Sequence, residues 1–148
     1  MRVFKSYGSP ERLFEMMKRV NNLNESVLPK EKKDVVINQF ITFTKEKLGL
    51  GDKMPSIKVS YDGKEASDMK SFGKYTPESN ELLVVAANRN LADVLRTLAH
   101  ELVHCMQRMK GLLKQDSSDT GSEIENEANA LAGVLMREFG QQNPIIFE

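Results

Sequence analysis

The chain has 148 residues, 40% of them apolar and 28% charged, which is the balance of an ordinary globular domain that can bury its own core. Basic and acidic residues both number 21, so the net charge is zero and a global electrostatic attraction to nucleic acid is excluded. The single cysteine, Cys105, cannot form an internal disulfide, which fits a reducing compartment. We find no apolar run of the ~20 residues that a membrane span needs and no signal-peptide layout, so we expect a cytoplasmic protein without a membrane partner.

Two helices are predicted in residues 1–50. Ser9 and Pro10 are a typical helix start, and an apolar stripe at helical spacing follows them. A second helix begins at Pro29 and ends at Gly49, and its predicted buried face consists of Val35, Val36, Phe40, Phe43 and Leu48. We predict residues 1–50 as an N-terminal helical segment that is a candidate for docking a protein partner. Residues 51–148 then form the core of one compact domain.

The period changes after residue 51. Residues 57–61 alternate and are rich in β-formers, and residues 72–75 are short enough for another strand. The continuous apolar run at 81–87 predicts a strand that is buried on both faces. The polar stretch 64–70 shows no regular spacing of apolar residues, so the sequence assigns it neither to a helix nor to a strand.

Two longer helices follow the strands. Asn90 is a predicted cap for a helix over 91–109, and Thr120 with Glu123 is a capping-box signature for a last helix over 121–139, which Gly140 should end. The buried stripe of the last helix is predicted as Ile124, Ala128, Leu131, Val134 and Leu135. Because the strands form one run between helices, we expect an α+β fold and not βαβ units. The small mixed or antiparallel sheet should pack on helix 91–109 and on the C-terminal helix.

The stretch His100-Glu101-Leu102-Val103-His104 carries the chemistry, and it contains the only two histidines of the chain. Residues four apart share a helix face, so both imidazoles can point at one place. Glu101 lies about 100° further round the helix and can reach that place from the side. Two neutral imidazoles beside a carboxylate predict a catalytic zinc site, with Glu101 as the general base.

A catalytic zinc ion needs a third protein ligand. No third histidine exists, and Cys105 sits beside His104, where it cannot easily close the site. The last helix offers Glu123, Glu125 and Glu127. We favour Glu125, because Asn129 one turn later can hydrogen-bond the free nitrogen of a bound histidine, whereas Glu127 is followed at that spacing by Leu131. The other two glutamates remain alternatives.

The sequence motifs HELVH and ENEANALA together resemble those of the zincin metallopeptidases of the Glu-ligand branch, the gluzincins. The chain is most similar to their small single-domain members, the ImmA/IrrE-like and minigluzincin-type proteins. In that pattern a ligand Glu is followed by Ala three residues later and by Asp or Asn four residues later, as Glu125 is by Ala128 and Asn129. The resemblance covers residues 57–140 and implies a zincin-like fold. The opening YGSPERLFEMMKRVN is similar to small proteins of large tailed phages, which implies a phage protein in the host cytoplasm or virion.

The resemblance implies a metallopeptidase with one Zn²⁺ per chain that acts on a peptide or protein substrate, and no nucleic acid partner is expected. Many such enzymes carry a further His or Tyr that stabilises the transition state, and here Tyr75 and Tyr61 are the candidates. An extended substrate could pair with strand 72–75 or 82–85. The alternative functions are a catalytically silent zinc-binding structural or virion-associated protein, and a regulator whose residues 1–50 dock a partner.

Overall fold

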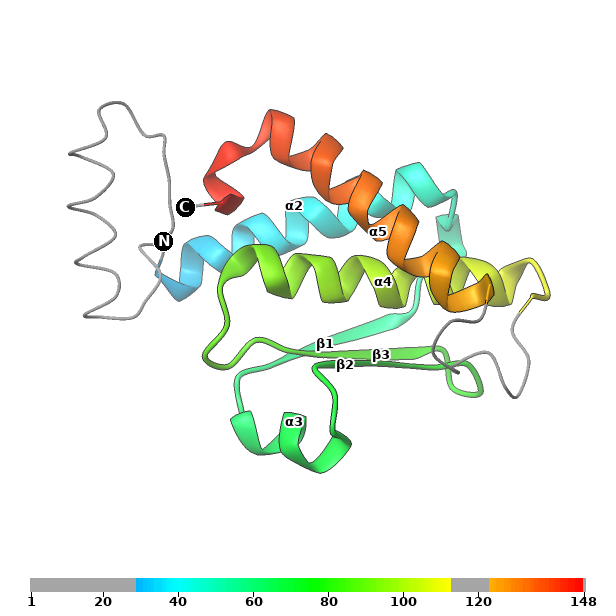
Figure 1. Cartoon of the computed structure of the whole chain (residues 1–148), viewed down its shortest axis with the longest axis horizontal. Coiled ribbons are helices and arrows are strands. Elements are labelled where there is room, and N and C mark those ends of the chain that lie inside the picture. The colour runs from blue at the N-terminus through cyan, green and yellow to red at the C-terminus, as the bar shows by residue number, and fades with distance from the viewer. Residues whose placement is uncertain (1–28, 113–122, 148) are drawn as a thin grey trace.

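The structure is a computed structural model that describes residues 29–112 and 123–147. Figure 1 shows a helix, α4, between a small sheet on one side and two helices on the other. The elements in chain order are α2 (Lys30–Leu48), η1 (Gly51–Lys53), β1 (Ser56–Ser60), α3 (Gly63–Met69), β2 (Gly73–Thr76), β3 (Glu81–Val85), α4 (Leu91–Met109), α5 (Glu123–Gln142) and η2 (Pro144–Phe147). The fold is therefore α+β, as predicted. The first predicted helix and the Thr120 cap lie outside the described residues.

The sheet has three strands in the order β1-β3-β2. β1 runs parallel to β3, and β2 runs antiparallel to it, so the sheet is mixed. β3 is the central strand of the sheet, and within the described part of the chain β1 and β2 are the two edge strands. Leu82 and Val84 are buried against the helices, and on the other face Val85 is completely buried whereas Leu83 is half-buried. The prediction that this strand is buried on both faces therefore holds at Val85 and only in part at Leu83. Because β2 is an edge strand, the backbone groups on one of its sides have no strand partner within the described residues. The Tyr75 N–H on that side faces α4.

The polar stretch that the sequence did not assign forms the short helix α3, on the side of the sheet away from α4 (Figure 1). The Asp62 side chain caps it by accepting a hydrogen bond from the backbone N–H of Lys64 at 2.9 Å. Lys70 ends it in the left-handed conformation, with φ of 58°. None of its residues is buried, so no apolar period could have predicted it.

α4 begins where Asn90 accepts a hydrogen bond from the backbone N–H of Asp93 at 2.9 Å, as predicted. Leu95, Leu98 and Leu102 are completely buried, because the sheet covers one flank of the helix while α2 and α5 cover the other. A helix enclosed in this way holds its central turns rigidly. The His-Glu-x-x-His word lies in those turns.

α2 contributes to the same core. Phe40 is completely buried and meets Phe139 of α5 edge-to-face, with ring centroids 5.0 Å apart. Val35, which we predicted to be buried, is 56% exposed, and Ile37 is buried instead, since the buried face is rotated by a fraction of a turn. The division at residue 50 stays a prediction, but the described part of the first segment packs directly on α4 and α5.

α5 continues through Gly140, which we predicted to end it, to Gln142. The glycine instead lets the ring of Phe147 lie against the helix, because a Cβ at this position would be 2.4 Å from that ring. Val134 is 38% exposed and is not part of the buried stripe, whereas Ala128 and Ala132 are buried. These two small residues let α5 approach α4 closely.

Candidate metal centre

His100 and His104 lie one turn apart on α4 and face the same space. Their Nε2 atoms are 3.2 Å apart, and the two rings are nearly perpendicular, at 87°. His104 is 9% exposed, and the neighbouring Leu102 and Val103 are completely buried and anchor this turn. The helical spacing therefore places two imidazole nitrogens at one point, as the sequence predicted.

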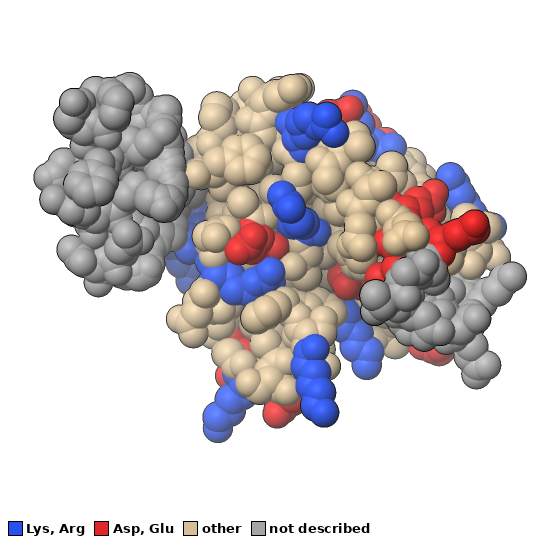
Figure 2. All heavy atoms as spheres, in the orientation of Figure 1, with Lys and Arg blue, Asp and Glu red and all other residues tan. Residues whose placement is uncertain are grey.

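α5 brings a carboxylate to the same point. Glu125 Oε1 lies 3.1 Å from His100 Nε2, and Glu125 Oε2 lies 3.0 Å from His104 Nε2. Donor atoms of the three residues all lie within 4.8 Å of one another. The alternative glutamates lie elsewhere: Glu127 contacts Gln107, and Glu123 is exposed. Figure 2 shows acidic side chains gathered over the start of α5. Of the two acidic residues in the first turn of this helix, Glu123 and Glu125, Glu125 is the one that meets both histidines.

This donor set fits a zinc ion. Two imidazole nitrogens and one carboxylate oxygen are a known three-ligand set for catalytic zinc, and a fourth position stays open. A ligand histidine must be neutral, and the pKa of His100 is lowered from its ordinary value, mainly by burial and then by the neighbouring His104. The Glu125 carboxylate opposes this effect. Within residues 29–112 and 123–147, these three residues form the one group of His, Cys, Asp and Glu side chains that could hold a metal ion.

Glu101 lies on the sheet side of the same helix turn, facing β2. Its pKa is raised to about 7, chiefly because burial disfavours the charged carboxylate, and the Glu125 carboxylate acts in the same direction. His104 and a hydrogen bond from the backbone N–H of Tyr75 lower it. Gly73 allows this close approach, since a Cβ there would lie 3.2 Å from Glu101 Cγ. A carboxyl group with this environment can exchange a proton near neutral pH.

A known protein family matches the part of the chain that contains these residues. The model of the peptidase family described as IrrE N-terminal-like domain matches residues 55–137. The chain belongs to this family. The match runs from β1 into α5 and thus includes both histidines, Glu101 and Glu125, and it confirms the resemblance to ImmA/IrrE-like proteins. No curated protein and no solved structure matches the chain. Assignment to the gluzincin branch and a phage origin stay predictions.

Tyr75 meets the site of this IrrE N-terminal-like domain through its backbone. Its N–H donates to the Glu101 carboxylate, while its hydroxyl donates to Asn80 Oδ1 at 2.6 Å and interacts with Cys105. Burial and the Cys105 thiol raise the pKa of Tyr75 to about 12. Tyr61, the other tyrosine considered, donates to Asp34 Oδ1 of α2 at 2.7 Å. The role of Tyr75 as a transition-state stabiliser stays a prediction. Cys105, which interacts with the Tyr75 hydroxyl, is completely buried.

Two amides hold the histidines. Asn129 forms a hydrogen bond with the side chain of His100. A bond from Asn129 to one of the two histidines was predicted from the sequence. The second amide, Gln107, was missed: its Oε1 lies 2.7 Å from His104 Nδ1. The signal that could have found it is a polar residue, three positions after a histidine, on the buried face of an apolar helix.

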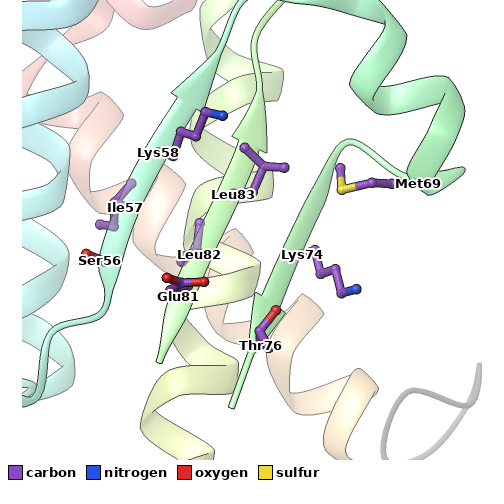
Figure 3. Close-up of a pocket in the computed structure, with 9 residues that line it drawn as sticks. All are labelled: Ser56, Ile57, Lys58, Met69, Lys74, Thr76, Glu81, Leu82 and Leu83. Atoms are coloured by element: carbon purple, nitrogen blue, oxygen red, sulfur yellow. The ribbon is translucent and has the colours of Figure 1, made fainter. Parts of the chain in front are cut away.

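A pocket of about 460 Å³ lies against the sheet and contains none of these residues (Figure 3). Lys58 and Lys74 line it from the two edge strands, Leu83 from the central strand, and Met69 from α3. These strand positions alternate with the ones that are buried against α4, so the pocket opens on the opposite face of the sheet. It is separate from the histidine cluster.

No described helix is long and apolar enough to cross a membrane.

Proposed function

We propose that this IrrE N-terminal-like domain is a zinc-dependent peptidase. The convergence of His100, His104 and Glu125 within 4.8 Å carries the proposal. Glu101 adds to it, because a purely structural zinc site has no use for a buried carboxylate beside three ligands. The peptidase family of the chain supports the same conclusion.

His100, His104 and Glu125 would hold the zinc ion, which when bound would supply Lewis acidity that lowers the pKa of water to about 7 and polarises a carbonyl group. The chain's own residues provide the proton transfers. Glu101, buried beside the ligands, takes the proton from the attacking water and later passes it to the leaving amine. Asn129 and the other contacts of the histidines keep the ligands oriented.

We propose that an extended substrate pairs with β2 rather than with strand 82–85, because β3 already has a strand partner on each side. Directly before β2, the carbonyl of Phe72 accepts from Val85 N at 2.8 Å, so the alternation of an antiparallel pair turns the backbone of Tyr75 to the free edge. The bond from Tyr75 N–H to Glu101 agrees with this direction. An extended peptide that adds to this edge lies directly beside the general base.

Glu101→Gln tests the proposal. The amide keeps the volume but cannot accept the proton, so the rate of peptide hydrolysis should fall at least about 100-fold. Zinc content, measured by mass spectrometry of the purified protein, should stay at about one per chain, because Glu101 is not a ligand. The rate is measured with a library of fluorogenic peptides.

Survival of full activity in Glu101→Gln would show that the base is assigned wrongly. A wild-type protein that binds zinc but cleaves no peptide would instead support a catalytically silent zinc protein.

A further inference from the structure

Gln107 is a buried amide with three partners. It is 0% exposed and lies on α4 one turn after His104. Its Oε1 is 2.7 Å from His104 Nδ1, while its Nε2 donates to the carbonyl of Ile124 at 3.0 Å and to Glu127 Oε1 at 2.7 Å. A buried amide is costly unless its groups are bonded, and here both ends are.

The two partners on α5 fix the orientation of this amide. The carbonyl of Ile124 and the carboxylate of Glu127 can only accept hydrogen bonds, so the NH₂ end must face them. The oxygen of Gln107 therefore faces His104. Because this oxygen can only accept, Nδ1 of His104 must carry the hydrogen, and its lone pair is left on Nε2.

We propose that Gln107 is a positioning residue that holds His104 in its metal-binding tautomer and ties it to the turn of α5 that carries Glu125. The inference deepens the proposed function and rests on its metal site. Nε2 of His104 is the atom that lies 3.0 Å from Glu125 and 3.2 Å from His100, so the tautomer selected by Gln107 is the one the site needs.

The same side chain links the two helices that share the site. Ile124 and Glu127 flank Glu125 in sequence, and Gln107 bonds to both. The distance between a ligand on α4 and a ligand on α5 is thereby set before any ion binds. Groups that hold a ligand in this way typically contribute about 10- to 100-fold in metal affinity.

Gln107→Met tests the inference, because methionine has a similar shape but neither accepts from Nδ1 nor donates to α5. We expect the zinc dissociation constant, measured by competition with a chromophoric chelator, to rise about 10- to 100-fold. The visible absorption of the Co²⁺-loaded protein should change as well, since it reports the ligand geometry. The unfolding temperature of the metal-free protein is recorded alongside.

Met136→Ala is the matched control for loss of stability alone. Met136 is 2% exposed on α5, and it lies eleven residues, or about 16 Å of helix, beyond Glu125. Its truncation should lower the unfolding temperature of the metal-free protein and leave the zinc affinity of the folded form unchanged. If Gln107→Met behaves in the same way, with zinc affinity and Co²⁺ spectrum like those of the wild type, Gln107 only joins two helices and the inference is wrong.

The double variant Gln107→Glu with Glu127→Gln gives a rescue test in a core of unchanged volume. The carboxylate at 107 still accepts from His104, and the amide at 127 now donates to it, while the carbonyl of Ile124 loses its donor. Zinc affinity should be at least about 3-fold tighter than in Gln107→Met, because the acceptor for His104 Nδ1–H is restored. A folded double variant that binds zinc as weakly as Gln107→Met contradicts the inference.

The wild-type measurement separates the two proposals. A wild-type protein that binds no zinc overturns the proposed function together with this inference. A wild-type protein that binds zinc tightly, with Gln107→Met equal to it, overturns the role of Gln107 alone.

Discussion

Glu125 is the residue that converts two histidines on one helix into a three-donor site, because its two oxygens lie 3.1 and 3.0 Å from the two Nε2 atoms. Replacing it by Ala removes a ligand and leaves two imidazoles, so zinc affinity should fall by more than about 100-fold, the upper range for groups that only support a ligand. Zinc content after dialysis and a chelator titration measure the loss. Glu123→Ala, an exposed carboxylate in the same first turn, is the matched control and should keep its zinc. Equal zinc binding by both variants would mean that the third ligand is a different residue.

At this scale the sequence predicted which side chains gather, since His100 with His104 and Glu125 with Asn129 are related by spacings within single helices, and the resemblance to the gluzincins paired the two helices. It did not predict contacts that depend on strand pairing, or contacts between helices that lie outside that pattern. The contact of the Tyr75 backbone with Glu101 follows from the alternation of β2, which no spacing reveals. The role of Gln107 depends on α5 presenting two acceptors to α4.

β2 and α4 approach each other closely at Gly73, where a Cβ would lie 2.4 Å from Thr97 Cγ2 and 3.2 Å from Glu101 Cγ. Gly73→Ala should therefore push the edge strand away from the general base, at a cost of about 1–3 kcal/mol in the free energy of unfolding. The catalytic efficiency kcat/KM on peptides should fall with it, because the strand that receives the substrate has moved. Thermal unfolding and peptide cleavage measure the two effects.

The same substitution at Gly133 is the control for Gly73→Ala. Gly133 lies inside α5 with nothing within 4 Å of a built Cβ, so alanine there should stabilise the helix by about 0.5–1 kcal/mol. An alanine at position 73 that matches this gain would show that β2 does not need a glycine beside Glu101.

The elements themselves were predictable to different degrees. α2, α4 and α5 have an apolar face, and their periodicity located them within a few residues. α3 has no buried residue and showed no period. The order of the strands was beyond the sequence, because pairing β1 with β3 in parallel and placing β2 at an edge depend on contacts far apart in the chain.

For the whole molecule, the family match begins at residue 55, whereas the buried core already includes residues of α2. Phe40 of α2 is completely buried against Phe139 of α5, the helix that also carries Glu125. A chain that starts at residue 51 would expose this apolar surface of α4 and α5, so we expect it to be unfolded or aggregated and unable to bind zinc. The full chain with Phe40→Ala should fold but lose about 3–5 kcal/mol in the free energy of unfolding by urea. Val35→Ala, at a 56% exposed position on the same helix, should change it by no more than about 0.5 kcal/mol. A folded, zinc-loaded protein lacking residues 1–50 would show instead that α2 is an attachment to a core that stands alone.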